Sequence, residues 1–271
     1  MPNHVTNHVT FLGSTERIKE LRAKCKTTES PFSFKAFHPM PTELVGTSSP
    51  AKIVTEQELQ DWKDKLANGE LKDWEKDYRP ITEKESKRFI KKYGTDNWYN
   101  WQTENWGTKW DCYDHIEISE SEIHFNTAWS TPIRALMILS RMFDDITIEV
   151  RYADEDFGCN VGIYTLQGGH IESIYQPSYS KESVKLAMDI LSDTEYWVTD
   201  RLCEFEEEDE LEGFELWLVE IAHDEGYLLE EYPIVVLGLL FDMAVADEQY
   251  ERAGQIKNLI KLKLNSGDLK Q

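Results

Sequence analysis

The order of its strand-like and helix-like segments constrains the fold of this chain most. Strands are predicted where β-branched and apolar residues alternate, and helices where apolar residues recur every three or four positions. Ser14 is a suitable N-cap for the first helix, and Pro132 lies where the first turn of the second helix begins. In chain order, the predicted segments are a strand over 3–12, a helix over 15–26, strands over 113–118 and 123–129, a helix over 133–143 and a strand over 146–152.

This order is β-α-β-β-α-β, which is typical of a ferredoxin-like α+β domain. Right-handed crossovers would place both helices on one face of an antiparallel sheet. Two further strands, over 159–166 and 170–176, are joined by the tight-turn signal Gln167-Gly168-Gly169. We expect this added hairpin to extend the sheet, and a helix over 181–191 to follow it.

The long interval between the first helix and the second strand predicts an insertion at about residues 38–110. Residues 30–50 are rich in Pro and Ser, which favours a loop with at most a short strand near Phe34–Phe37. Thr55 and Thr82 are each followed three residues later by Glu, so each is predicted to begin a short helix. We therefore predict a ferredoxin-like domain over 1–194 with a helical, Trp-rich insertion, and a separate C-terminal region over 195–271.

The C-terminal region is acidic and helical in pattern. It has thirteen Asp and Glu residues and no Lys or Arg between Glu204 and Glu231, within a chain whose net charge is −22. This charge excludes a basic protein that coats nucleic acid, and it argues against a polybasic membrane anchor. A strong local negative field favours a basic protein partner. The partner-binding candidates are Glu206, Glu207, Glu208, Asp209 and Glu210.

An apolar stripe marks a helix over about 247–264. Such a stripe needs an apolar partner, which the helical segment over 233–245 would supply as an antiparallel hairpin. The residues at helical spacing are Tyr250, Ala253, Ile256, Ile260 and Leu264.

Four tryptophans lie close together in residues 97–110. The first interpretation is packing, because tryptophan carries a large apolar area and its N–H needs only one partner. The second is an aromatic platform that stacks on a sugar or a base. The high negative charge disfavours direct nucleic-acid binding, since phosphate contacts supply most of that affinity. The ligand-binding candidates in and beyond this region are Trp106, Lys109, Trp110, Asp111 and Trp129, with Lys109 and Asp111 as a potential ion pair.

A cluster of acids, Asp154-Glu155-Asp156, follows the strand over 146–152. Asp154 and Asp156 would point to the same side in strand geometry, and clustered carboxylates suit Mg²⁺ or Ca²⁺. This predicts a metal-dependent hydrolase as one alternative function. The other interpretation is a solvated acidic turn before Gly158.

Several classes of motif are missing from the chain. The four cysteines form no C-x-x-C pair, and no phosphate-binding loop, dinucleotide fingerprint or nucleophile elbow occurs. The chain begins with polar residues and has no apolar run of about 18 residues. We therefore expect a cytoplasmic protein with no cofactor and no membrane segment. The sequence leaves its oligomeric state open.

Several motifs resemble those of the YubB-like family of phage- and plasmid-borne proteins. The resemblance covers roughly residues 1–190 and implies a ferredoxin-like fold and a bacterial mobile element, but no catalytic residues. The matching stretches are Met1-Pro2-Asn3, residues 39–44, Trp98-Tyr99, residues 105–111, residues 125–132 and residues 152–158.

The C-terminal segment over 240–260 resembles the UVR helical hairpin, which is a protein–protein contact element. Together with the acidic segment, this resemblance favours a non-enzymatic protein-interaction module as the main prediction. The hydrolase and a single-strand nucleic-acid binder that uses the tryptophan cluster are the alternatives.

Overall fold

The computed structural model describes residues 3–156, 158–191, 237–238, 240–241, 244–245 and 249–265. The chain divides into two compact units. The first comprises Met1–Tyr152 and Ile163–Tyr175, and the second comprises Ala153–Gly162 and Gln176–Gln271. The acidic segment between Glu204 and Glu231 lies outside the described residues.

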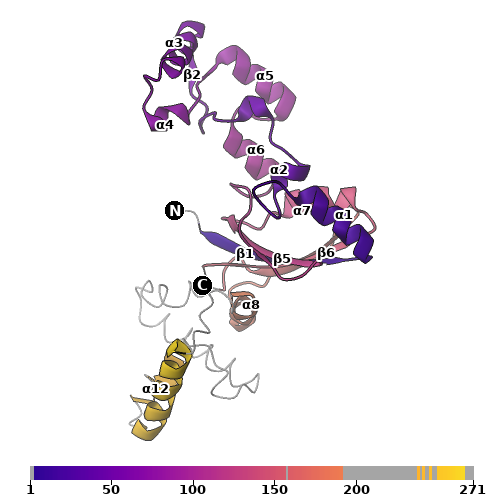
Figure 1. Cartoon of the computed structure of the whole chain (residues 1–271), viewed down its shortest axis with the longest axis vertical. Coiled ribbons are helices and arrows are strands. Elements are labelled where there is room, and N and C mark those ends of the chain that lie inside the picture. The colour runs from indigo at the N-terminus through magenta and orange to yellow at the C-terminus, as the bar shows by residue number, and fades with distance from the viewer. Residues whose placement is uncertain are drawn as a thin grey trace. The chain divides into compact units, whose positions relative to one another are not determined.

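A six-stranded sheet forms the centre of the first unit (Figure 1). Its spatial order is β4-β5-β1-β6-β7-β8. The first four strands of this order have the ferredoxin-like arrangement, and the hairpin β7–β8 extends the sheet beyond β6. The predicted α+β fold is therefore confirmed. The strands are β1 (His4–Leu12), β4 (Tyr113–Glu117), β5 (Glu122–Ala128), β6 (Thr147–Asp154), β7 (Gly162–Gln167) and β8 (His170–Tyr175).

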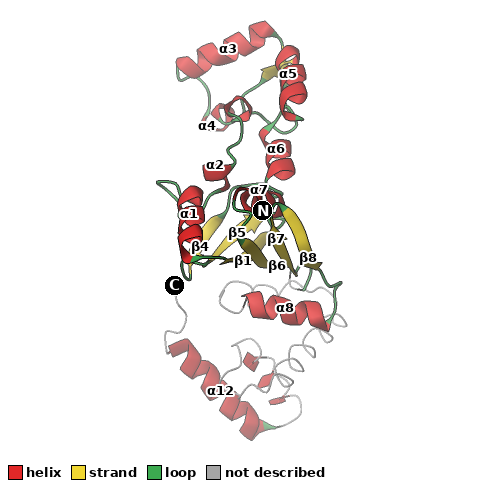
Figure 2. Cartoon of the chain, turned by 90° about the vertical axis from the view of Figure 1, so that its right-hand side faces the viewer, coloured by secondary structure: helices red, strands yellow, loops and turns green. Residues whose placement is uncertain are grey.

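The helices α1 (Thr15–Cys25) and α7 (Ile133–Met142) cover one face of this sheet (Figure 2). The side chain of Ser14 accepts a hydrogen bond from the backbone N–H of Arg17 and so caps α1 as expected. In β1 the alternate residues Val5, Val9 and Phe11 are buried in the core. Because side chains alternate along a strand, the intervening residues of β1 lie on the opposite face.

A short helix, α2 (Phe34–Phe37), lies where the sequence predicts a loop with at most a short strand. Helical spacing allows Phe34 and Phe37 to be buried together in the core. The helix start is held by Ser33 and by the carboxylate of Asp111, whose Oδ1 accepts the N–H of Phe34 at 2.8 Å. Since Asp111 lies far along the chain, local sequence could not reveal this cap.

The insertion consists mainly of short helices, as predicted (Figure 1). Thr55 and Thr82 both form capping boxes with the Glu three residues later. A two-stranded parallel sheet, β2–β3, was not predicted, because two-residue strands carry no periodic signal. The elements are the 3₁₀ helix η1 (Thr42–Leu44), β2 (Ile53–Val54), α3 (Glu56–Ala67), α4 (Asp73–Lys76), β3 (Ile81–Thr82), α5 (Glu83–Tyr93) and α6 (Trp98–Asn105).

The second unit contains α8 (Lys181–Leu191) and α12 (Tyr250–Asn265). Apolar residues from 237–244 and from α12 share one small core, which is the packing that a helical hairpin requires. Its buried members are Leu237, Leu240, Ala244, Ala253 and Ile256. Among the helices described in either unit, none has the length and apolar character needed to cross a membrane.

Candidate functional site: an exposed aromatic strip

The tryptophan cluster divides into a buried and an exposed part. Trp101 and Trp106 are buried, and their rings meet edge to face at a centroid distance of 5.7 Å. The indole Nε1 of Trp106 donates a hydrogen bond to the backbone carbonyl of His38 at 2.9 Å. Both residues therefore pack the core, and Trp106 offers no exposed surface to a ligand.

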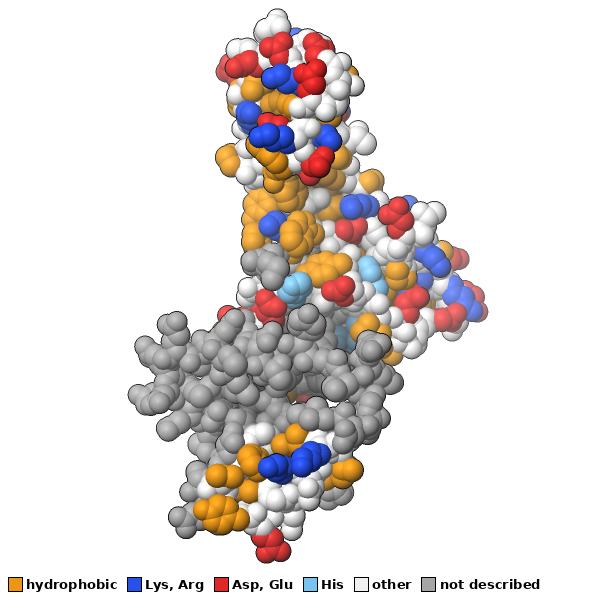
Figure 3. Space-filling model, turned by 60° about the vertical axis from the view of Figure 1, so that its left-hand side comes forward, with side chains coloured by type: hydrophobic (Ala, Val, Ile, Leu, Met, Phe, Trp, Pro, Cys, Tyr) orange, Lys and Arg blue, Asp and Glu red, His pale blue; other side chains and the backbone are white. Residues whose placement is uncertain are grey.

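The part that reaches the surface forms what we call the aromatic strip, and Figure 3 shows hydrophobic side chains gathered on one face of the first unit. Trp98 and Tyr99, in the first turn of α6, meet edge to face at 5.7 Å, and Tyr99 meets Trp129 at 6.2 Å. Trp110 is 39% exposed and Trp129 is 44% exposed. The strip comprises Trp98, Tyr99, Lys109, Trp110 and Trp129.

Lys109 connects two indole rings of the strip. Its Nζ atom lies 4.7 Å from the ring centroid of Trp110 and 4.4 Å from that of Trp129. A cation over an aromatic face is attracted by the ring quadrupole. The ammonium therefore helps to hold both rings in place while leaving part of each exposed. The structure brings together three of the five predicted ligand-binding candidates here.

Trp129 has an unusual backbone conformation, with a φ of 70°. This left-handed region is unfavourable for a bulky residue and persists only where the surroundings enforce it. The N–H of Trp129 donates to the carbonyl of Asn3 at 2.9 Å, and the preceding carbonyl, that of Ala128, accepts from the hydroxyl of Thr108 at 2.8 Å. These bonds hold the exposed indole in a defined place.

Hydrogen bonds connect the loop before β4 to the residues at the start of α7. The hydroxyl of Ser130 donates to the carbonyl of Gly107 at 2.5 Å, and the N–H of Ala135 donates to the carbonyl of Trp106 at 3.1 Å. Gly107 has a φ of +85°, and a Cβ there would lie 3.4 Å from the backbone nitrogen of Arg134. Lys109 and Trp110 therefore project from a braced loop.

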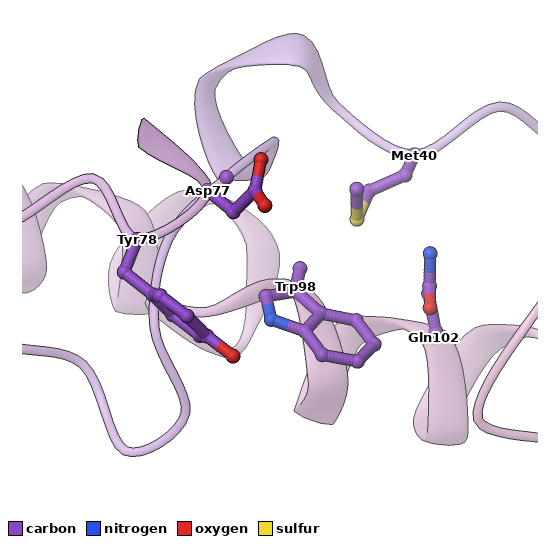
Figure 4. A pocket seen from close by; sticks show the side chains of 6 residues that line it. Met40, Asp77, Tyr78, Trp98 and Gln102 are labelled. Atoms are coloured by element: carbon purple, nitrogen blue, oxygen red, sulfur yellow. The ribbon is translucent and has the colours of Figure 1, made fainter. Parts of the chain in front are cut away.

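A shallow pocket of about 290 Å³ adjoins the Trp98 end of the strip (Figure 4). In the figure, Asp77 and Tyr78 lie on one side of the Trp98 indole, and Met40 and Gln102 lie on the other. Sequence reasoning missed the pocket, because its residues come from separate parts of the insertion. The lining residues are Met40, Gly46, Asp77, Tyr78, Trp98 and Gln102.

The Asp111 side chain interacts with residues at the start of α2 and does not belong to the aromatic strip. Its carboxylate accepts hydrogen bonds from the Ser33 hydroxyl at 2.6 Å and from the N–H of Phe34. Its ion pair is with Lys35, at 3.8 Å, in place of the predicted pair with Lys109. Asp111 therefore stabilises the start of α2.

Cys112 and His115 form a thiol–imidazole contact, with Sγ and Nε2 3.4 Å apart. Burial and the neighbouring carboxylate of Asp111 raise the pKa of the Cys112 thiol well above its usual value. Burial lowers the pKa of His115. Because a nucleophilic cysteine requires a thiolate, this pair lacks the electrostatics of a catalytic dyad.

Asp154 is the last residue of β6 and Asp156 lies in the turn that follows, and both belong to the second unit. Asp154 is buried, and its carboxylate accepts hydrogen bonds from the N–H of Asp156 at 2.9 Å and the Asn160 side chain at 2.8 Å. Within the described part of the chain, no group of three or more His, Cys, Asp or Glu residues is arranged to hold a metal ion. Asp154 braces its turn, and the metal site stays a prediction. The acidic candidates Glu206–Glu210 lie outside the described residues.

Comparison with known proteins supports the ferredoxin-like assignment. Residues 105–212 match a family model described as a ferredoxin-like domain in Api92-like protein. The crystal structure of a protein api92 from Yersinia pseudotuberculosis aligns with 66% of this chain and 99% of its own, at 10% identity and a TM-score of 0.29. No curated protein matches the chain. The strand order and the family model therefore agree on a ferredoxin-like domain.

Proposed function

We propose that this chain is a protein-interaction module that binds a basic partner protein through the aromatic strip. The observation that carries the proposal is the half-exposed indole of Trp129, held at a positive φ between Tyr99 and the ammonium of Lys109. Exposed aromatic side chains fixed by a rigid framework are typical of interface hot spots, because they bury much area and lose little conformational freedom.

The charge of the chain supports a basic partner. Its net charge of −22 creates an attractive field for a cationic protein and repels nucleic acids. The candidates Glu206, Glu207, Glu208, Asp209 and Glu210 would add to this attraction, which acts mainly on the association rate. The resemblance to the YubB-like family adds the further proposal that the module serves a bacterial mobile element.

The first test uses the full-length chain as bait for proteins from a bacterial lysate. The double variant Trp110→Ser/Trp129→Ser removes two exposed rings, and Trp74→Ser removes an exposed ring outside the strip as the matched control. We expect one defined protein to be captured by the wild type and by the control, and to be lost with the double variant. Equal capture by all three baits would overturn the proposed surface.

A second measurement separates the proposal from nucleic-acid binding. We expect a twelve-residue oligothymidylate to leave the tryptophan fluorescence of the chain unchanged at 0.15 M salt, on the order of physiological ionic strength. Quenching that Trp110→Ser/Trp129→Ser abolishes and that weakens steeply with salt would instead assign the strip to single-stranded nucleic acid.

A third measurement addresses the acidic segment. Replacing the five candidates over 206–210 by their amides removes five negative charges with little change in side-chain size. Once the captured partner is purified, we expect a lower association rate and a weaker salt dependence for this variant. An unchanged association rate would restrict partner binding to the strip.

A further inference from the structure

The pocket beside Trp98 has an electron-rich lining. Two aromatic rings, a carboxylate, an amide and a thioether face it, and none of its six lining residues is basic. We infer that this pocket binds the guanidinium of an arginine side chain on the partner protein. The inference rests on the proposed function, which it deepens by naming the group that the partner inserts.

The first argument concerns Gln102. The residue is 7% exposed, and its Oε1 atom is buried without a hydrogen-bond partner among the described residues. A buried acceptor left unpaired costs about 1–3 kcal/mol, so such groups are normally satisfied. In Figure 4 the amide nitrogen of Gln102 lies toward Met40, and the amide oxygen lies on the side away from Met40. A half-turn of this amide would exchange the two atoms and present the oxygen to an N–H donor in the pocket.

The second argument concerns Asp77. Its carboxylate is exposed, and within the described part of the chain it makes no ion pair or hydrogen bond. The neighbouring acids are engaged: Asp73 pairs with Lys76 at 2.7 Å, and Glu75 accepts the N–H of Lys72 at 2.9 Å. Asp77 therefore remains available as the counter-ion of a cation that enters the pocket.

The third argument concerns the rings. Tyr78 is 51% exposed, and Trp98 lies between Asp77 and Gln102 in Figure 4. A guanidinium stacks on aromatic faces and, with five N–H donors in a plane, can also serve a carboxylate and an amide oxygen. A lysine ammonium is a compact point charge that stacks less well. The combination of acceptors and rings therefore favours arginine.

The size of the pocket agrees with a single side chain. Its volume of about 290 Å³ is just below the range of about 300–1,000 Å³ that small-molecule sites occupy. Gly46 adds no side chain to the rim, and its φ of +73° disfavours a larger residue at this position. A planar headgroup on a flexible stem fits such a space.

The test uses three fluorescein-labelled Gly-Ser peptides, each with one central arginine, lysine or citrulline. Citrulline has the shape of arginine without its charge. We expect the full-length chain to bind the arginine peptide most tightly in fluorescence anisotropy, followed by lysine and then citrulline. Equal binding of the arginine and citrulline peptides would overturn the inference. Tighter binding of the lysine peptide would also overturn it, because the pocket would then select an ammonium group.

Matched variants separate the pocket from the general negative field of the chain. Asp77→Asn and Asp73→Asn each remove one negative charge, four residues apart. We expect Asp77→Asn to weaken arginine-peptide binding about tenfold, because a charge-assisted hydrogen bond contributes about 1.5–3 kcal/mol. Asp73→Asn should weaken it less than about twofold. Equal effects of the two variants would overturn the pocket assignment.

The outcome for the pocket is distinguishable from that for the strip. If partner capture depends on Trp110 and Trp129 but not on Asp77, the proposed function stands and the pocket inference fails. If the arginine peptide requires Asp77 but capture is independent of the strip, the pocket inference stands and the proposed surface fails. Tyr78→Ser, which removes an exposed ring, should weaken arginine-peptide binding in a chain that remains folded.

Discussion

The Nζ atom of Lys109 lies 4.4 Å from the centroid of the Trp129 indole ring. The contact joins a loop residue to the residue that follows β5, and the same Nζ atom lies 4.7 Å from the ring centroid of Trp110. One cation thus orients two exposed rings. The surface is therefore prepared in the free protein, which lowers the conformational cost of binding.

Loss of the Lys109 ammonium should destabilise the strip by a measurable amount. We expect Lys109→Gln to lower the free energy of unfolding by about 0.5–1 kcal/mol, as found for exposed cation–π contacts, and Lys109→Arg to retain most of it. Urea titration measures the difference. Lys63→Gln, which replaces an exposed lysine of α3, is the control and should have almost no effect. A Lys109→Gln variant as stable as wild type would contradict the role of the cation.

The positive φ at position 129 predicts an unusual order of stabilities. Trp129→Gly should be more stable than Trp129→Ala by about 1 kcal/mol, because glycine occupies the left-handed region without strain. At Trp110, whose φ is not positive, the order should be reversed. Thermal unfolding of the four variants gives the comparison. If alanine is the better residue at both positions, the backbone at Trp129 is not strained.

Buried and exposed tryptophans should respond differently to the same substitution. Trp106→Phe loses a hydrogen bond to the His38 carbonyl and leaves space in the core, so it should cost about 2–4 kcal/mol. Trp110→Phe should cost less than about 0.5 kcal/mol because that ring is partly exposed. Urea midpoints provide the measurement. Similar costs at the two positions would show that the division between core and strip is wrong.

A stacked histidine pair on the face of the sheet opposite the buried residues Val9 and Phe11 of β1 predicts pH-dependent stability. The rings of His8 and His124 are 3.4 Å apart and nearly parallel. Burial first, and then the charges of His124 and Arg151, lower the pKa of His8 from the usual 6.5 to about 3. Between these values the unfolded chain binds a proton that the folded chain does not. Stability is therefore full above pH 6.5 and falls as the pH drops toward 3, by up to about 1.4 kcal/mol per pH unit.

Urea unfolding at about pH 7.5, 6.0 and 4.5 measures this dependence, because the first value lies above the usual histidine pKa and the other two lie below it. His8→Phe should reduce the loss of stability on acidification, while His170→Gln, which replaces an exposed histidine, should retain the wild-type loss. Identical pH profiles for wild type and His8→Phe would contradict the assignment to His8.

Stability measurements distinguish a structural role of Asp154 in the turn after β6 from a role in metal binding. Because Asp154 already accepts hydrogen bonds from Asp156 and Asn160, Asp154→Ala should lower the free energy of unfolding of the second unit by about 1–3 kcal/mol. We expect millimolar Mg²⁺ or Mn²⁺ to leave the melting temperature of the wild type unchanged. A metal-dependent rise that Asp154→Ala removes would favour the metal site, since a ligand that binds the native state stabilises it.

Local patterns in the sequence determined most of the secondary structure. The alternation along the strands, the Ser14 cap and the threonines that begin α3 and α5 are short-range signals, and each was read correctly from neighbouring residues. Their order also predicted the ferredoxin-like sheet, because few topologies satisfy a right-handed β-α-β-β-α-β chain. The error at Phe34–Phe37 arose where a distant residue, Asp111, caps the helix.

Only the tertiary structure determines which aromatic side chains are exposed at the surface. Trp106 and Trp110 lie four positions apart in one aromatic segment, yet one is fully buried and the other is partly exposed. Composition and spacing could not separate them, because burial depends on which distant backbone or cation each ring meets. The pocket beside Trp98 likewise combines residues from separate loops and a helix. Local interactions specify the elements, whereas the strip and the pocket exist only after long-range packing has placed those elements together.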